Sequence, residues 1–181
     1  MDFALCVFCG AGVGAKPEYA AAARQVGAEL GRRGWTLVYG GGHIGLMGVV
    51  ADAAIAAGAR VVGVIPRFLH EREVAHRGLD ALEIVASFAD RKQRMGELAD
   101  AFLSLPGGVG TLDELFEAWS WTQAGLQRKP CGMLNVAGYY DELVRFLDRA
   151  NTDGFISPAS RDLLQVATDV SALLDRLAVR A

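Results

Sequence analysis

We expect the fold of this chain to be arranged around the stretch Leu105-Pro106-Gly107-Gly108-Val109-Gly110-Thr111-Leu112-Asp113-Glu114. An apolar run over residues 101–105 leads into it and predicts a strand, and an amphipathic run from Thr111 predicts a helix. The glycines between them let the backbone approach a ligand closely, and the unpaired N–H groups at a helix start suit a phosphate. The stretch therefore predicts a phosphate-binding turn between a strand and a helix.

The same stretch is also open to a purely structural interpretation. Thr111 and Glu114 have the spacing of a capping box, in which both side chains satisfy orphan N–H groups at a helix start. The spacing alone leaves both interpretations open. The segment Pro106-Gly107-Gly108-Val109-Gly110 favours ligand binding, because a cap needs no glycine-rich approach.

The composition limits the class of protein. The chain has 181 residues, of which 52% are hydrophobic and 22% charged, and this fits one globular domain over residues 1–181. A net charge of −3 provides no basic field, so we expect no nucleic-acid partner. No apolar stretch reaches the length of a membrane span and no signal-peptide pattern opens the chain, so we expect a cytoplasmic protein with no membrane partner.

The chain has three cysteines, Cys6, Cys9 and Cys131, and an odd number argues against a disulfide framework. Cys6-x-x-Cys9 could form a redox pair or half of a metal site. However, no second pair of ligands has suitable spacing, and both residues lie in an apolar run that predicts a buried strand. We therefore interpret the cysteines as structural and expect neither a metal nor a cofactor.

Short apolar runs alternate with helical patterns along the whole chain. This alternation predicts a single α/β domain with a doubly wound parallel sheet and helices on both faces. We expect strands at residues 4–9, 36–39, 60–65, 81–85, 101–105 and 131–134. We expect helices at residues 17–33, 44–57, 88–100, from 111 onward and at 139–151. The expected remainder is a charged loop at 66–78, a turn at 153–158 and two short helical stretches at the end.

Three predicted strands run directly into glycine-rich turns, at Gly10, Gly40 and Gly107. Ligands of an open parallel sheet bind outside the carboxyl ends of its strands, so the three turns can converge on one crevice. The first turn, Gly10-Ala11-Gly12-Val13-Gly14, lacks the G-x-G-x-x-G spacing, and the P-loop pattern is absent. We therefore expect a small phosphate-bearing ligand rather than a dinucleotide or an ATP-hydrolysis site.

Two charges do not fit a solvated face. Helical periodicity places Arg91 on the same face as Phe88 and Met95, and an inward arginine needs an anionic partner unless it snorkels or forms a structural ion pair. The same periodicity directs Lys92 elsewhere, toward solvent. Glu114 lies one turn into the helix that follows the phosphate turn, so the fold can bring Arg91 and Glu114 to the same strand end.

An arginine, a carboxylate and a phosphate turn suit chemistry on a sugar phosphate. Cleavage of an N-glycosidic bond passes through an oxocarbenium-like state, which a carboxylate can stabilise while it orients or deprotonates the attacking water. Nucleophilic catalysis has less support, because no Ser or Cys lies in a nucleophile elbow.

The chain resembles the LOG ("Lonely guy") family of cytokinin riboside 5′-monophosphate phosphoribohydrolases. Three motifs carry the resemblance: Tyr39-Gly40-Gly41-Gly42-His43-Ile44-Gly45-Leu46-Met47-Gly48, Arg91-Lys92, and Pro106-Gly107-Gly108-Val109-Gly110-Thr111-Leu112-Asp113-Glu114. The likeness covers nearly the whole chain. It implies a Rossmann-like homodimer with its site at the dimer interface. The implied reaction hydrolyses N6-modified AMP, and often AMP itself, to the free base and ribose 5-phosphate.

The resemblance also implies roles for individual residues. By position, Arg91 and Glu114 would be the catalytic pair. The implied substrate-binding residues are Gly10, Gly41, Gly42, Phe88, Lys92, Gly107, Gly108, Val109, Gly110 and Thr111.

Two departures from the family pattern bear on substrate choice. The family commonly has Cys-Gly-Ser-Ser in the first turn, whereas Cys9-Gly10-Ala11-Gly12 lacks both hydroxyl donors. The family also has Met-His shortly before the Arg-Lys pair, where this chain has Phe88-Ala89. Phe88 could stack against a base or belong to the core.

Two alternative functions stay open. The first is a nucleotide or molybdenum-cofactor carrier without turnover, for which the missing hydroxyl donors are the motivation. The second is a lysine decarboxylase, a label that proteins resembling this one have carried. A pyridoxal-phosphate enzyme needs a Schiff-base lysine, and none of Lys16, Lys92 and Lys129 stands in a context that suggests one.

Overall fold

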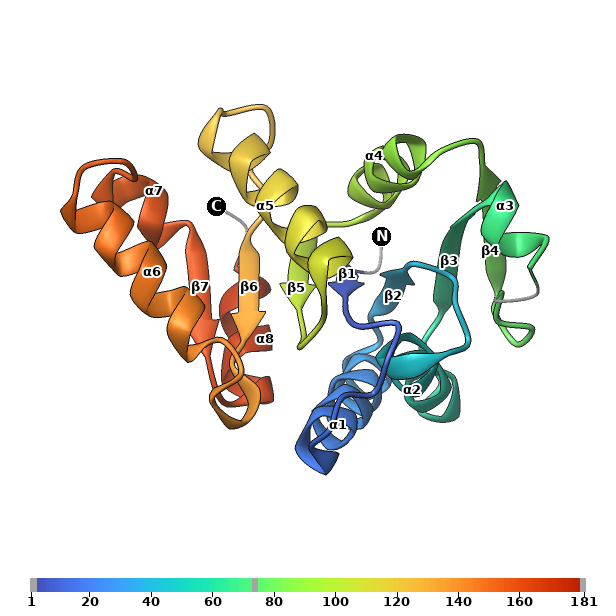
Figure 1. The fold of residues 1–181 in the computed structure, drawn as a ribbon. Helices are drawn as coiled ribbons and strands as arrows, with labels where there is room; N and C mark the ends of the chain where they lie inside the picture. The colour runs from blue at the N-terminus through green and yellow to red at the C-terminus, as the bar shows by residue number, and fades with distance from the viewer. Residues whose placement is uncertain (1–2, 73–74, 180–181) are drawn as a thin grey trace.

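The computed structural model describes residues 3–72 and 75–179. Its centre is a seven-stranded sheet with the strand order β4-β3-β2-β1-β5-β6-β7, in which all neighbouring strands are parallel (Figure 1). The strands are β1 (Ala4–Phe8), β2 (Thr36–Tyr39), β3 (Val61–Pro66), β4 (Ala81–Val85), β5 (Ala101–Ser104), β6 (Cys131–Leu134) and β7 (Leu164–Ala167). The predicted α/β class with a parallel sheet is confirmed.

Helices cover both faces of the sheet, with α1 and α2 on one side and α4 and α5 on the other (Figure 1). The helices are α1 (Pro17–Arg33), α2 (Gly45–Ala56), α3 (Arg67–His70), α4 (Phe88–Leu98), α5 (Val109–Gln123), the 3₁₀ helix η1 (Val136–Gly138), α6 (Asp141–Thr152), α7 (Pro158–Asp162) and α8 (Val170–Leu177). No helix in this described part of the chain is long and apolar enough to cross a membrane.

The central strand β1 is buried on both faces, which explains its uninterrupted apolar sequence. Its side chains alternate. Leu5 and Val7 pack with the layer of α1, α2 and α8, whereas Cys6 and Phe8 pack with the layer of α4, α5 and α6. Cys9 follows β1 on the Val7 side, so Cys6 and Cys9 belong to opposite layers. All three cysteines are free and buried, so the predicted burial of Cys6 and Cys9 is confirmed.

The strand order changes direction between β1 and β5, and this switch point defines the site. The chain leaves β1 for α1 on one face of the sheet and leaves β5 for α5 on the other. A crevice therefore opens at the carboxyl ends of these two strands. The Gly10 N–H donates a hydrogen bond to the Pro106 carbonyl oxygen at 3.0 Å and joins the two glycine turns.

The start of α5 differs from the sequence prediction. The helix begins at Val109, two residues before Thr111, with Gly108 as the N-cap residue and no side-chain cap. Thr111 and Glu114 therefore do not form a capping box, and that interpretation is wrong. The helix starts inside the glycine run because the turn is fixed by tertiary contacts, which override the poor helix propensity of glycine.

The two short helices predicted at the end of the chain are present as α7 and α8. The edge strand β7 at residues 164–167 lies between them and was not predicted, because pairing with β6 supplies its backbone hydrogen bonds. The expected loop at 66–78 contains the short helix α3. Residues 73–74 of that loop lie outside the described residues.

Candidate active site

Arg91 extends from the first turn of α4 toward the ends of the central strands. The Ser87 side chain caps α4 by accepting a hydrogen bond from the Asp90 N–H, so the helix start is fixed. The Arg91 Nε donates to the Val64 carbonyl oxygen at 3.2 Å, and its Nη2 lies 4.0 Å from the Met47 Sδ. The side chain is only 11% exposed. The predicted inward direction of Arg91 is confirmed.

Gly40 makes room for this guanidinium, a role that the sequence did not reveal. A Cβ atom on Gly40 would lie 1.6 Å from the Arg91 Nη2, so no larger residue fits while Arg91 keeps its position. The predicted Gly41 and Gly42 lie one step further along. The Gly41 carbonyl accepts from the His76 N–H, and Gly42 forms a bridge with Ala75. Gly40 is therefore the glycine of this turn that touches the arginine.

Glu114 faces Arg91 from α5. The Arg91 Nη1 and the Glu114 Oε1 are 3.6 Å apart, close enough for attraction but longer than a hydrogen bond. The Glu114 side chain is also only 11% exposed. Burial raises the pKa of Glu114 to about 7, although the nearby Arg91 charge opposes the rise. The predicted meeting of Arg91 and Glu114 is confirmed, and it produces a carboxyl group suited to proton transfer near neutral pH.

Lys92 is not solvated as its helical position suggested. Its Nζ lies 2.9 Å from the Asp113 Oδ2 and also contacts the Glu117 carboxylate, so it ties α4 to α5. Burial lowers the pKa of Lys92, but hydrogen bonds to Glu117 and Asp113 outweigh this effect and raise it. The structure thus directs Lys92 toward the carboxylates that flank Glu114.

The glycine turns after β1 and β5 enclose a cavity of about 380 Å³. Its lining includes Gly10 to Gly14, Tyr19, Leu46, Pro106 to Gly108 and Tyr139. Gly108, Val109 and Gly110 are exposed at the start of α5, whereas Thr111 is buried. A Cβ on Gly107 would lie 2.1 Å from the Thr111 Oγ1, so Thr111 is directed at the turn. The predicted phosphate residues are therefore contiguous in space.

Two tyrosines whose role could not be predicted from the sequence hold this turn from the other side. The Tyr139 hydroxyl donates to the Gly107 carbonyl oxygen at 2.7 Å, and the buried Tyr140 hydroxyl donates to the Leu105 carbonyl oxygen at 2.7 Å. Both tyrosines follow β6, which pairs with β5. The sequence does place both tyrosines just after the strand that follows the glycine turn. That position is the signal from which their role could have been predicted.

Phe88 lies at the surface beside the Arg91 end of the site. It is 51% exposed and makes an edge contact with Phe68, with 5.3 Å between the ring centroids. The core interpretation of Phe88 is therefore wrong. An exposed aromatic ring at this position is available to a planar base.

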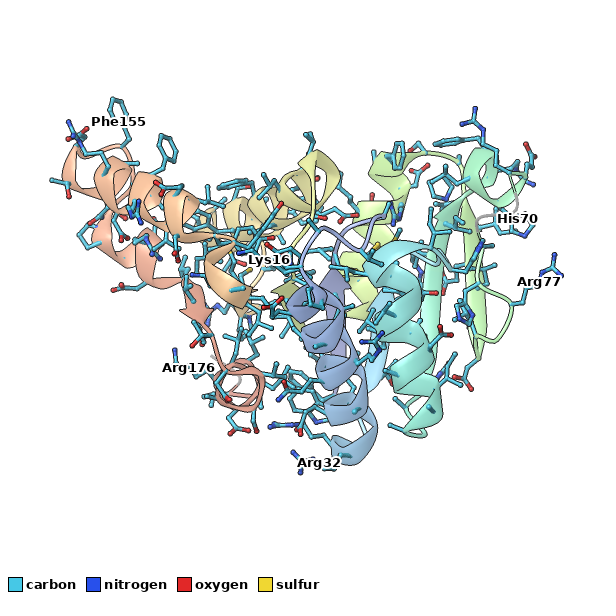
Figure 2. The ribbon with its side chains drawn as sticks, turned by 60° about the horizontal axis from the view of Figure 1, so that its bottom comes forward. Lys16, Arg32, His70, Arg77, Phe155 and Arg176 are labelled. Atoms are coloured by element: carbon cyan, nitrogen blue, oxygen red, sulfur yellow. The ribbon has the colours of Figure 1, made fainter. Side chains whose placement is uncertain are left out.

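The three lysines considered for a pyridoxal-phosphate Schiff base each have a partner within the protein. The Lys16 Nζ, which lies near the start of α1 (Figure 2), donates to the Ala137 carbonyl oxygen at 3.3 Å. The Lys129 Nζ donates to the Gly96 carbonyl oxygen at 2.5 Å. Lys92 is bound by carboxylates, as described above. Among residues 3–72 and 75–179, no group of three or more His, Cys, Asp or Glu side chains could hold a metal ion.

The fold is shared with solved structures of molybdenum-cofactor proteins. The cofactor-binding protein of Rippkaea orientalis matches with a TM-score of 0.75 and 20% identity, over 97% of this chain and 95% of that chain. The carrier protein of Chlamydomonas reinhardtii matches with a TM-score of 0.73 and 20% identity, over 98% of each chain. At this identity the likeness shows the fold alone.

Sequence comparison identifies much nearer relatives. Residues 47–177 match the family model described as "Possible lysine decarboxylase". The cytokinin riboside 5′-monophosphate phosphoribohydrolase LOG7 of Arabidopsis thaliana is 47% identical over 96% of this chain and 80% of its own length. LOG1 of the same plant is 45% identical over 96% of this chain and 81% of its own length. The chain therefore belongs to the family of LOG-type cytokinin riboside 5′-monophosphate phosphoribohydrolases.

Proposed function

We propose that this protein hydrolyses the N-glycosidic bond of AMP or of an N6-modified AMP and releases the free base and ribose 5-phosphate. The observation that carries the proposal is the buried pair of Arg91 and Glu114 beside the glycine turns. Relatives at 45–47% identity are named for this reaction class, which supports the proposal. The first-turn residues Ala11 and Gly12, which lack hydroxyl donors, line the cavity of the glycine turns and are not among the contacts of Arg91 and Glu114.

In the proposed mechanism, the N–H groups at the start of α5 bind the 5′-phosphate and place the ribose beside Glu114. The ionised carboxylate orients a water molecule and accepts its proton as the water oxygen bonds to C1′. The C1′–N9 bond breaks, its electron pair stays with the base, and the base takes a proton from solvent. Positive charge that develops on the ribose is stabilised by the same carboxylate. Arg91 keeps Glu114 in place and remains free to bind a substrate hydroxyl.

A panel of nucleotides tests the proposal. AMP, isopentenyl-AMP, GMP, CMP and adenosine are incubated with the protein, and released bases are separated by chromatography. We expect release from the adenine monophosphates and little from adenosine, which lacks the phosphate. Glu114→Gln and Arg91→Ala should lose at least about a hundredfold in kcat, since a general base contributes about 10²–10⁴-fold. Unchanged circular dichroism of both variants serves as the folding control.

The carrier alternative makes the opposite prediction for the same assay. A carrier would bind nucleotide tightly, and the unmodified protein would release no base. The likeness to molybdenum-cofactor carriers does not favour this outcome, because it is limited to the fold. Base release that depends on Glu114 excludes the carrier alternative.

We further propose that two copies pair through the layer of α4, α5 and α6, with the site at the interface. Large apolar side chains are exposed on this layer: Phe88 on α4, Val109 on α5, Phe146 on α6 and Phe155 after α6. Phe155 projects away from the rest of the molecule (Figure 2). Exposed apolar surface of this kind is typical of an interface. We also propose the cytoplasmic location that the sequence predicts, and cell fractionation tests it.

A further inference from the structure

We infer that Tyr139 is a positioning residue that turns the phosphate loop toward its anion. The inference rests on the proposed function and concerns how the loop at residues 105–108 is held. Tyr139 lies after β6, far from this loop in sequence, and its ring lines the same cavity. Its hydroxyl donates to the Gly107 carbonyl oxygen at 2.7 Å.

Three consecutive carbonyl groups of the loop are occupied by donors from elsewhere in the protein. The Leu105 carbonyl accepts from the Tyr140 hydroxyl, the Pro106 carbonyl from the Gly10 N–H, and the Gly107 carbonyl from the Tyr139 hydroxyl. Carbonyl oxygens repel an anion, and each of these three bonds instead pairs a carbonyl of the loop with a donor of the protein itself.

The same bonds fix the direction of the N–H groups. In a planar trans peptide, the N–H of one residue points opposite to the C=O of the residue before it. The bond from Gly10 to the Pro106 carbonyl therefore directs the Gly107 N–H, and the bond from Tyr139 to the Gly107 carbonyl directs the Gly108 N–H. Together with the orphan N–H groups in the first turn of α5, they form a set of successive donors that suits an anion.

The segment that carries Tyr139 is held in place by contacts of its own. The Asn135 side chain accepts from the Tyr140 N–H at 2.8 Å and donates to the Asp141 carboxylate at 2.7 Å. Ala137 is held at a φ of 50°, a left-handed conformation that L side chains rarely adopt. The Tyr139 ring also makes edge contacts with Tyr19 and Tyr140. The hydroxyl is thus placed before any ligand arrives.

Tyr139→Phe removes this hydroxyl and keeps the ring. We expect it to weaken binding of ribose 5-phosphate and of inorganic phosphate, measured by titration calorimetry, by roughly fivefold to tenfold, the effect of one hydrogen bond. The KM for AMP should rise by a similar factor while kcat stays nearly constant. The slow reaction of adenosine, which has no phosphate to bind, should be unaffected.

Tyr39→Phe is the matched control. It removes a buried hydroxyl that has no hydrogen-bond partner among the described residues and does not line the cavity. Equal phosphate affinity of Tyr139→Phe and the unmodified protein would overturn the inference, as would an equal loss in Tyr39→Phe. If the unmodified protein binds phosphate but releases no base, the proposed function fails while the binding comparison still decides the role of Tyr139. A loss of kcat with unchanged KM in Tyr139→Phe would also contradict the inferred positioning role of Tyr139.

Discussion

At the scale of single residues, the environment of Glu114 decides what its carboxyl group can do. The group is buried, and its cation Arg91 lies at 3.6 Å, beyond hydrogen-bond distance. Burial therefore outweighs the attraction, and the pKa of Glu114 rises to about 7. A general base with this pKa is partly ionised at neutral pH and still basic enough to accept a proton from water.

The raised pKa of Glu114 has a consequence for stability. Between pH 4.5 and about 7 the folded protein binds more protons than the unfolded chain, so stability present below pH 4.5 is lost as the pH rises through 7. The loss can reach about 3 kcal/mol, at 1.36 kcal/mol per pKa unit. Glu114→Gln should not show this loss. Urea unfolding of both proteins at pH 5 and pH 8 measures it, and parallel changes in the two proteins would contradict the prediction.

Gly40 provides a second test at this scale. In Gly40→Ala, the new methyl group would occupy the position of the Arg91 Nη2. The flexible arginine can move aside, so we expect a folded protein whose kcat/KM for AMP is lower by roughly a hundredfold, the usual effect of a misplaced catalytic group. Gly12→Ala is the control, because a Cβ there would meet no atom within 4 Å. Equal activity of Gly40→Ala and Gly12→Ala would show that Arg91 tolerates displacement.

At the scale of elements, the site depends on how α4 and α5 are held together. Arg91 and Lys92 are neighbours on α4, and Asp113, Glu114 and Glu117 face them from α5. Lys92 binds the two outer carboxylates and leaves the central one to Arg91. The two helices lie on the same face of the sheet (Figure 1), so this contact sets the distance between the reacting groups.

Lys92→Gln tests this contact. The Lys92 charge lowers the pKa of Glu114, so its removal should raise that pKa further. The acid limb of the kcat/KM profile should then move to higher pH. Arg94→Gln is the control, since Arg94 binds Glu83 on β4, away from Glu114. An acid limb that moves equally in both variants, or in neither, would argue against an electrostatic role for Lys92.

The sequence allowed the elements to be predicted where their patterns were local. The buried strands next to the site were found from their apolar runs, and Arg91 was found from helical periodicity. The edge strand β7 was missed because Leu164–Ala167 is a four-residue run between two helices, and only its pairing with β6 makes it a strand. The roles of Gly40 and Tyr139 were missed for a similar reason, since both depend on contacts with residues distant in the chain.

At the scale of the whole molecule, the two helical layers differ in what they present to their surroundings. The α4, α5 and α6 layer exposes Phe88, Val109, Phe146 and Phe155, and the site opens beside the first two. The proposed pairing would cover these side chains and exclude water from the ribose. Exclusion of water strengthens the electrostatic contacts of Arg91 and Glu114.

A charged substitution on this layer tests whether two copies of the chain pair through it. Phe155→Asp should shift the protein from dimer to monomer in light scattering and lower AMP hydrolysis, because Phe155 is 87% exposed in the isolated chain and would be covered in the dimer. Val179→Asp is the control, since Val179 is 69% exposed but follows α8, in the layer on the other face of the sheet. A monomeric unmodified protein, or a dimer that survives Phe155→Asp, would contradict the proposal.

The burial of all three thiols allows the opening of the fold to be measured by thiol labelling. Cys6 and Cys131 are buried in the layer of α4, α5 and α6, and Cys9 is buried in the layer of α1, α2 and α8. Burial raises their thiol pKa values, so none should react with a disulfide reagent while the fold is intact. Labelling should therefore proceed only as fast as the sheet separates, and all three thiols should be modified together. A nucleotide that binds the native state should slow the labelling in proportion to its occupancy. Rapid modification of one thiol alone would instead reveal a local opening of its layer.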